Sequence, residues 1–439
     1  MGSRRITMAV CHLDELVQAQ KRGEGKGLPS ICSAHKFVLR TAIRSGIRSG
    51  KPVLIEATCN QVNQYGGYTG MTPAAFYKYV SDIANKEGLP QGQLILGGDH
   101  LGPSVWQNEP AERAMQNAEV LVHEYVKAGF SKIHLDTSMY LGGDPATHPL
   151  DKELASHRTA RLARIAEETW ADQPDRPAPR YVIGTEVPTP GGALQHDDQI
   201  LVTSPAAVRD TIEAIRQAFN HEQVDGAWER VFALVVQPGV EFGDEFIQEF
   251  NPAKAALLSK EIEAFSNMVY EAHSTDYQST RALRELVQGH FAILKVGPAL
   301  TFAFREMVFS LAMIENELYS GHHSAYRSNI VDVIEAAMQK APKYWRDHYR
   351  GTPERQALAR KYSFSDRVRY YWNDPNVESS LNRLLINLGR KVIPYSLLSQ
   401  FTPIQYERIR QGLLQNSPET LIVDRINSVL QNYIDACEG

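Results

Sequence analysis

The sequence predicts an α/β protein, a TIM (β/α)8 barrel with a C-terminal helical extension. From about residue 29 onward, short apolar runs alternate with longer amphipathic segments, which is typical of repeated βα units and a parallel sheet. Eight such runs are present, and eight parallel strands close a barrel. Beyond about residue 318 the apolar runs stop while a helical pattern continues. We therefore expect a barrel over residues 13–317 and, over residues 318–439, a helical extension that packs on the barrel or on a partner subunit.

Each expected strand is short and apolar, and a segment with helical periodicity follows it. In residues 111–128, for example, Ala114, Ala118, Leu121 and Tyr125 recur at the spacing of one helix face. The extension contains two stripes of Arg, Tyr and Trp that suit either base stacking or aromatic packing, and the acids within them favour packing. The expected strands are residues 30–33, 52–57, 93–96, 132–136, 181–185, 231–237, 268–272 and 292–296.

Composition excludes several classes of function. The 439 residues are 43% hydrophobic, which is enough for a large core, and the net charge of -5 is spread along the chain. This balance argues against a nucleic-acid partner and against binding to an anionic membrane. The first residues contain no apolar run of signal-peptide length, and no later stretch is apolar enough for a membrane span. The four cysteines, Cys11, Cys32, Cys59 and Cys437, are scattered along the sequence, which favours reduced thiols. We expect a cytoplasmic protein.

The third expected strand ends in Gly97, Gly98, Asp99 and His100, an acid beside an imidazole. Alternation along a strand sends these two side chains to opposite sides of the pleat. Together they can divide the work of a general acid or base and a metal ligand. The alternative is a structural Asp-His pair at a turn. A catalytic role for Asp99 and a metal-binding role for His100 are favoured because other strands end in a similar way.

Polar side chains also follow the strands on either side. His35 after the first strand either lines the barrel mouth or begins a helix. After the second strand, an amide-rich and glycine-rich loop offers Asn60, Gln61 and Gln64 for hydrogen bonds to a hydroxylated or phosphorylated ligand. In the fourth strand His134 lies on the same face as Asp136. Asp136 is a candidate catalytic residue that acts on substrate or orients a ligand, and a structural role is equally compatible.

The last four strands complete the predicted site. Glu186 follows a buried strand and is a candidate both for catalysis and for metal ligation, since a carboxylate in that position is hydrated, paired or coordinating. Gln237, with Glu241 beyond it, and His273 are further candidate ligands. Gly297 precedes free amides at the start of a helix, which suits a phosphate. Histidines and oxygen ligands from separate strands suit a divalent cation such as Zn²⁺ with one open position.

These strand ends resemble a known family, the tagatose-bisphosphate aldolase subunit of the GatZ/KbaZ type. The resemblance covers nearly the whole chain, apart from the residues before about Leu13. It rests on residues 31–35 (ICSAH), 54–58 (LIEAT), 60–73 (NQVNQYGGYTGMTP), 97–103 (GGDHLGP), 130–136 (FSKIHLD), 181–188 (YVIGTEVP), 236–242 (VQPGVEF), 270–278 (YEAHSTDYQ), 293–303 (ILKVGPALTFA) and 362–372 (YSFSDRVRYYW).

The resemblance implies a place in tagatose 1,6-bisphosphate cleavage. Members of this type are regarded as non-catalytic subunits that support a separate zinc-dependent class II aldolase, which suggests a partner subunit and an oligomer. The chain is itself similar to class II aldolases, because Gly98, Asp99 and His100 look like their catalytic aspartate and following metal-binding histidine. His273 has a plausible counterpart, whereas Gln237 stands roughly where another histidine is expected.

The resemblance implies two functions from different classes. The first is an accessory subunit whose pocket binds sugar phosphate without turnover. The second is a metal-dependent aldolase or ketose 4-epimerase of the fructose/tagatose type that is active on its own. A sugar kinase is disfavoured because the sequence has neither a GxxxxGK[ST] loop nor a kinase-like glycine loop with its lysine.

Overall fold

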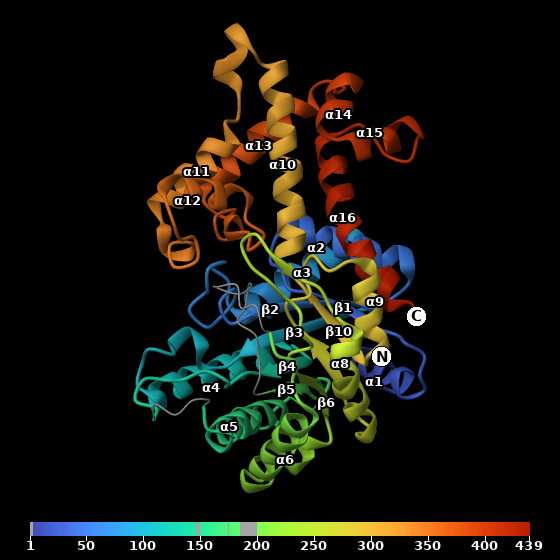
Figure 1. Cartoon of the computed structure of the whole chain (residues 1–439), viewed down its shortest axis with the longest axis vertical. Helices are drawn as coiled ribbons and strands as arrows, with labels where there is room; N and C mark the ends of the chain where they lie inside the picture. Colours follow the sequence, from blue (N-terminus) through green and yellow to red (C-terminus); the bar gives the residue numbers. More distant parts are fainter. Residues whose placement is uncertain (1–2, 146–149, 174, 185–199) are drawn as a thin grey trace.

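Eight parallel strands close into a barrel, which confirms the predicted fold class. The computed structural model describes residues 3–145, 150–173, 175–184 and 200–439. Around the barrel the strands follow the order β1-β10-β9-β6-β5-β4-β3-β2 (Figure 1). Each predicted strand overlaps an observed one, although the third continues to Leu101 rather than ending at residue 96. The strands are β1 (Leu28–Ile31), β2 (Val53–Thr58), β3 (Leu94–Leu101), β4 (Lys132–Leu135), β5 (Arg180–Ile183), β6 (Val231–Val235), β9 (Val269–Ala272) and β10 (Phe291–Val296).

Helices surround the barrel, and the one expected over residues 111–128 has the predicted bounds. A short antiparallel hairpin of β7 (Glu241–Phe242) and β8 (Ile247–Gln248) follows β6. Among the described residues, every helix is too short or too polar to traverse a lipid bilayer. The helices of this part are α1 (Ser3–Lys21), α2 (Lys36–Ser49), α3 (Pro73–Glu87), η1 (Pro103–Trp106), α4 (Ala111–Ala128), α5 (Lys152–Ala171), α6 (Pro205–His221), α7 (Asp225–Trp228), α8 (Pro252–Glu261), η2 (Ile262–Ala264) and α9 (Thr280–Gln288).

The beginnings of many helices can be traced to a two-residue signal in the sequence. A side chain that accepts hydrogen bonds from the first turn is followed at once by proline, whose fixed φ suits the first helical position and whose missing N–H costs nothing there. These capping residues are Thr72, Ser204, Asn251, Thr352, Asp374 and Ser417.

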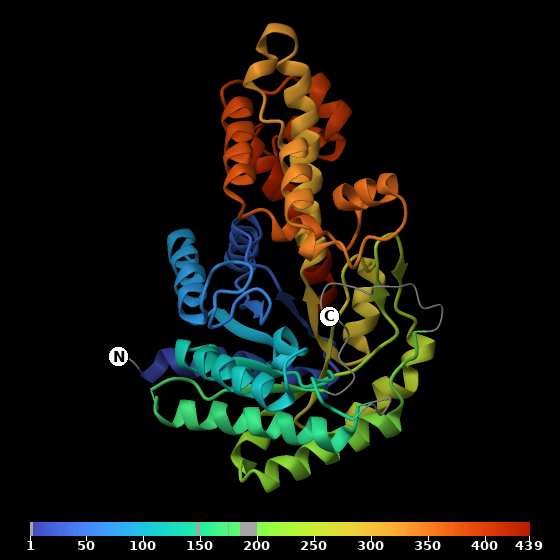
Figure 2. The ribbon, with the colours of Figure 1, turned by 90° about the vertical axis from the view of Figure 1, so that its left-hand side faces the viewer.

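The extension rises from the barrel on one long helix and returns on another (Figures 1 and 2). α10 (Pro298–Leu318) begins directly after β10, and α16 (Pro418–Cys437) packs beside it and then against α2, α9 and β1. The Tyr433 hydroxyl in α16 donates to the Thr275 carbonyl (2.7 Å). The helices between them are η3 (Gly321–Tyr326), α11 (Ile330–Lys340), η4 (Pro342–Tyr344), α12 (Pro353–Tyr362), η5 (Arg367–Tyr370), α13 (Pro375–Gly389), α14 (Tyr395–Phe401) and α15 (Pro403–Arg410).

One segment of the extension folds back over the barrel. The Phe364 N–H donates to the Asp244 carbonyl (3.0 Å), and the Tyr277 hydroxyl donates to the Phe364 carbonyl (2.5 Å). Thr301 donates to the Asp366 carboxylate (2.6 Å), which fixes the start of η5. Residues 363–372, the roof, therefore lie over the barrel mouth.

Candidate metal centre at the barrel mouth

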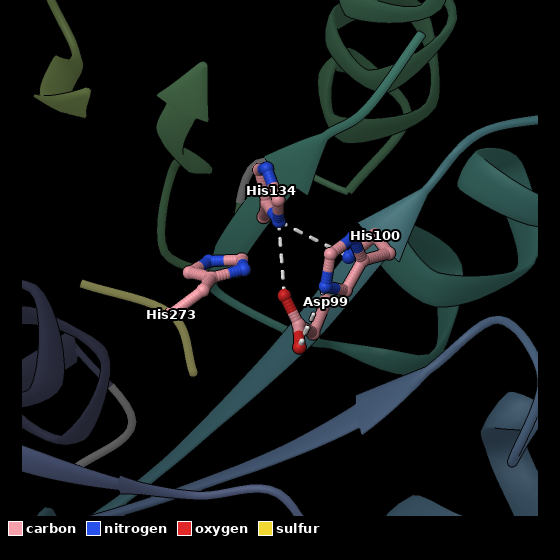
Figure 3. Close-up of side chains that lie close together, drawn as sticks. All are labelled: Asp99, His100, His134 and His273. Atoms are coloured by element: carbon pink, nitrogen blue, oxygen red, sulfur yellow. Dashed lines mark hydrogen bonds and ion pairs between the residues drawn. The ribbon is translucent and has the colours of Figure 1, made fainter. Parts of the chain in front are cut away.

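One aspartate and three histidines meet at the C-terminal end of the barrel strands (Figure 3). Asp99 and His100 come from β3, His134 from β4, and His273 from the residue after β9. Each offers one ligand atom, these atoms all lie within 4.8 Å of one another, and all four residues are buried. Asp99 Oδ1 lies 2.9 Å from His134 Nδ1. The barrel thus brings together three of the predicted site residues, Asp99, His100 and His273, with one further histidine, His134.

Asp99 and His100 reach the same pocket because the strand is irregular at this point. Regular alternation predicts that they point to opposite sides, and the structure differs. The register between β3 and β4 shifts between Gly98 and Leu101, and His100 has a left-handed backbone (φ 48°). An extra residue at a bulge turns a side chain that regular alternation would send outward. The left-handed conformation costs a non-glycine residue on the order of 1–3 kcal/mol, which is typical of functional sites.

Asp136 lies one step outside the cluster and orients His100. Its Oδ2 is 2.7 Å from His100 Nδ1, and its Oδ1 accepts hydrogen bonds from the Ser138 hydroxyl and N–H. Burial opposes the charge of Asp136, but the hydrogen bond and charge of His100 lower its pKa to about 2. A carboxylate behind a histidine fixes the tautomer and leaves the other ring nitrogen, Nε2, for a metal.

The donor set fits a divalent cation. His134 Nδ1 lies 2.9 Å from Asp99 Oδ1 and 3.1 Å from the His100 backbone nitrogen, so this ring nitrogen faces the cluster (Figure 3). His134 Nε2, on the other side of the ring, is buried with no hydrogen-bond partner among the described residues. Three imidazoles and a carboxylate match the ligands that Zn²⁺ takes in proteins.

A layer of alternating charges lies directly beneath the cluster, inside the barrel. Lys132 Nζ contacts Glu56 (2.8 Å) and Glu271 (2.7 Å), and Lys295 Nζ contacts Glu56 (2.9 Å), Glu271 (3.2 Å) and Asp99 (2.6 Å). Glu56, Lys132 and Glu271 are fully buried. Lys295 therefore joins this charged layer to the proposed catalytic carboxylate.

The electrostatics of the site favour an ionised Asp99. Burial alone would raise its pKa, but the charges of His100 and Lys295 outweigh burial and hold the pKa well below its ordinary value. Burial likewise opposes the charge of Lys295, yet Asp99, Glu271 and Glu56 raise its pKa well above normal. Burial lowers the pKa of His273 to about 3, so this ring is neutral, which is the form that binds metals.

A pocket extends from the cluster toward the roof. Its cavity volume is about 80 Å³, and Asp99, His100 and His273 line it together with the predicted substrate-binding residues Asn60, Gln61 and Gly297. Arg369 and Tyr370 of the roof line the same pocket. The extension therefore contributes directly to the site.

Other predicted residues lie elsewhere. Gln64 donates to the Asn117 carbonyl (2.9 Å) and does not line the pocket. Gln237 Oε1 accepts hydrogen bonds from the Gly239 and Val240 N–H groups, so its side chain closes a turn and is not part of the cluster. Glu186 lies outside the described residues.

The remaining candidates have defined neighbours. Oδ1 of Asp276 accepts hydrogen bonds from the N–H groups of Gly297 (3.0 Å) and Ala299 (2.8 Å), which occupies the amides expected to bind phosphate. The ring of His35 packs 4.1 Å from that of Phe304, measured between centroids.

Sequence reasoning missed several contributors to the site. The sequence places His134 on the inner face of its strand, but His134 is not among the predicted ligands. The signal that identifies it is its position two residues before Asp136, which puts both side chains on the same face of the strand. Lys295 carries a signal as well, because a lysine at an inward position of an apolar strand must be paired. Arg369 comes from the distant extension, and no local pattern places it at the barrel mouth.

Comparisons with known proteins agree with the sequence resemblance. The model of the family described as D-tagatose-1,6-bisphosphate aldolase subunit GatZ/KbaZ-like matches residues 13–438. A solved structure described as a probable tagatose 6 phosphate kinase from Sinorhizobium meliloti 1021 is 43% identical, with a TM-score of 0.85, over 94% of this chain and 100% of that chain.

Two solved aldolases align more loosely. The YdjI aldolase from Escherichia coli K12 is 10% identical with a TM-score of 0.41, over 84% of this chain and 93% of that chain. Fructose-bisphosphate aldolase from Campylobacter jejuni is 13% identical with a TM-score of 0.43, over 85% and 91%. At these values neither likeness supports an argument about the site.

Proposed function

The chain belongs to the D-tagatose-1,6-bisphosphate aldolase subunit GatZ/KbaZ-like family, and from this premise we propose that it is itself a divalent-metal-dependent enzyme acting on a ketose or ketose phosphate. The observation that carries the proposal is the convergence of Asp99, His100, His134 and His273 within 4.8 Å. A subunit without catalytic function has no need of three buried imidazoles around a carboxylate, each with a costly desolvation.

The residues divide into ligands and an acid/base. His100, His134 and His273 hold the cation, and their nitrogen donors favour Zn²⁺. When bound, a divalent cation supplies a Lewis acid that polarises a substrate oxygen. Asp99 is an ionised carboxylate in the pocket, beside the histidines, and accepts the proton of the substrate hydroxyl at C4. Lys295, 2.6 Å from Asp99, keeps that carboxylate charged between turnovers.

Loss of the C4 hydroxyl proton begins two related reactions. In aldol cleavage the C3–C4 bond breaks as the C4 oxygen becomes a carbonyl, and its electron pair stays on C3 as an enediolate with the C2 oxygen. Attack of C3 on the other face of the new carbonyl, with return of the proton to the C4 oxygen, inverts C4. Asn60 and Gln61 in the same pocket offer amides for the remaining hydroxyls. The same acid/base therefore serves both an aldolase and a ketose 4-epimerase.

Metal analysis and activity of the isolated chain test the proposal. We expect about one equivalent of divalent metal, and turnover of tagatose, fructose or their phosphates that chelation abolishes. His100→Ala and His134→Ala should each lose the metal and the activity. His123→Ala in α4, whose ring contacts Thr169 instead, is the matched control and should retain both. A purified chain with neither metal nor turnover contradicts the proposal.

A second function is favoured by the description of the family as an aldolase subunit. In this case the chain binds a separate class II aldolase and raises its activity and stability, and sugar phosphate binds here without turnover. Mixing the two purified proteins should then raise the aldolase rate and melting temperature, and His100→Ala should do so equally well. Turnover by the isolated chain that disappears in His100→Ala excludes a purely accessory role.

The kinase activity in the description of the Sinorhizobium meliloti protein is not proposed for this chain. Nucleotide-dependent phosphoryl transfer needs a phosphate-cradling loop, and the sequence has no GxxxxGK[ST] motif.

A further inference from the structure

A second group of metal-ligand side chains lies on the outer wall of the barrel, where α5 and α6 pack side by side (Figures 1 and 2). His157 in α5, His221 at the last position of α6 and Glu222 after it each offer one ligand atom. These three atoms all lie within 4.8 Å of one another. None of the three residues lines the pocket at the barrel mouth, so this group, the outer site, is separate from the candidate metal centre.

The two imidazoles of the outer site are available to a ligand. Their ring centroids are 5.2 Å apart and their planes are nearly perpendicular (89°). Both side chains are exposed, and neither forms a hydrogen bond or ion pair with another residue in the described part of the chain. A neutral imidazole has one ring nitrogen with a free lone pair, which is the usual histidine ligand of metals. His157 and His221 therefore supply two nitrogen ligands without breaking an existing bond.

Glu222 supplies the third ligand from a suitable position. Arg164 of α5 contacts Oε2 of this carboxylate (3.2 Å). The arginine thereby orients the carboxylate, as groups behind metal ligands commonly do, and leaves Oε1 for a cation. His221 and Glu222 also lie at the C-terminal end of α6, where the unpaired carbonyls of a helix carry partial negative charge and favour a cation.

The two helices hold these ligands at nearly the spacing that one ion needs. Zn²⁺ binds imidazole nitrogens at about 2.0–2.1 Å, so the three atoms must move somewhat closer together than they lie now. Small rotations of exposed side chains achieve this at little cost. The helix backbones are already fixed, because Lys152 contacts Asp210 (3.7 Å) and Arg164 contacts Glu222 on either side of His157 along α5.

We propose that His157, His221 and Glu222 form a second divalent-metal site, in which Zn²⁺ fastens α5 to α6 on the outside of the barrel. Two nitrogens and a carboxylate oxygen suit this ion and leave a fourth position for water. The role is structural, because an ion held by two helices of the folded chain stabilises it against unfolding. The inference goes beyond the proposed function and does not depend on it. Because the ligands are exposed, the ion exchanges with solvent, and a dialysed chain should retain only the metal at the barrel mouth.

Calorimetric titration of the full-length chain with Zn²⁺, after treatment with a chelator and its removal, tests the outer site. We expect a weaker phase of binding in addition to the tight phase at the mouth. His157→Ala and His221→Ala should each weaken this phase about 100-fold or more, since loss of a group that only supports a ligand already costs about 10- to 100-fold. His123→Ala is the matched control: its partly exposed ring has Glu124 and Thr169 as neighbours, and both phases should remain.

Thermal unfolding tests the structural role. The variant His100→Ala, which lacks a ligand at the mouth, isolates the outer site. Zn²⁺ at about 100 times the dissociation constant of the weaker phase should raise the melting temperature of this variant by about 3 °C. The shift should disappear when His157→Ala is added. Because His157 is exposed, this substitution should leave the melting temperature of the metal-free protein nearly unchanged.

The outcomes separate the outer site from the proposed function. Absence of the weaker phase, or a weaker phase that His157→Ala and His221→Ala leave unchanged, overturns the outer site. A missing temperature shift in His100→Ala, or one that persists when His157→Ala is added, overturns its structural role. A weaker phase that the two variants remove supports the outer site even if the mouth holds no metal and the chain has no turnover. Metal-dependent turnover without a weaker phase refutes the outer site alone.

Discussion

Replacing Lys295 by methionine removes one of two cations from the charged layer inside the barrel. Lys295 Nζ contacts Asp99, Glu56 and Glu271, and its side chain is 6% exposed. Methionine fills a similar volume, so the main effect is electrostatic. Lys132 then remains the lysine partner of Glu56 and Glu271, while Asp99 keeps only its histidine neighbours.

The structure sets the size and the pH dependence of the loss. Removing one partner of a buried ion pair costs about 3–5 kcal/mol, and for a chain of this length that corresponds to a fall of roughly 3–6 °C in melting temperature. In the native protein burial opposes the charges of Asp99 and Glu271, but neighbouring cations hold both pKa values well below normal. Their stabilisation is present at neutral pH and is lost as pH falls through the folded pKa values. Without Lys295 a carboxylate becomes easier to protonate, so the deficit should be largest near pH 8 and smaller near pH 5.

Urea and thermal unfolding at both pH values measure this effect. Lys254→Met, at an exposed position of α8, is the matched control and should change little. A deficit of less than about 1 kcal/mol, or one that is equal at pH 5 and pH 8, would refute the reasoning, because a buried unpaired carboxylate must respond to both perturbations.

Three further predictions test other parts of the site. Asp99→Asn should lower kcat about 10²- to 10⁴-fold. It should spare folding, because the layer then still pairs two glutamates with two lysines. A large fall in melting temperature would show that the role of Asp99 is structural. Asp136→Asn should weaken metal affinity about 10- to 100-fold in chelator competition, and unaltered affinity would contradict its orienting role. Burial raises the pKa of Glu241 to about 7. The contribution of Glu241 to stability is therefore complete below about pH 4.5 and is lost as pH rises to 7. In urea unfolding, Glu241→Gln should be about 3 kcal/mol more stable than the native protein at pH 8 and equally stable at pH 4.5. Parallel pH profiles of the two proteins would contradict this expectation.

The barrel could be predicted because its determinants are local. Alternating apolar runs and amphipathic segments report strands and helices one at a time, and Thr-Pro, Ser-Pro and Asp-Pro pairs mark where several helices begin. The closing of eight parallel strands then follows from their number. The end of β3 was the exception, since strand pairing continues through the glycines to Leu101 where local pattern indicates a break.

The site was predictable only as far as strand ends could be read. Asp99, His100 and His273 follow apolar runs, and a parallel barrel brings such positions to one rim. Gln237 follows a strand too, but its amide closes a turn, and sequence does not reveal which polar side chains satisfy their own backbone. Arg369 lies at the mouth because long-range packing of the extension carries it there, which no local periodicity records.

The paired connection of α10 and α16 between the two parts of the molecule has a mechanical consequence. Because α10 and α16 contact the barrel at separate places, together they resist both bending and rotation of the extension relative to the barrel, whereas a single connecting helix would allow either motion. Residues 363–372 are in addition tied to the barrel by hydrogen bonds with Asp244, Tyr277 and Thr301. A molecule that reaches Asp99 must therefore fit beneath an extension that is held at both its ends and at its middle.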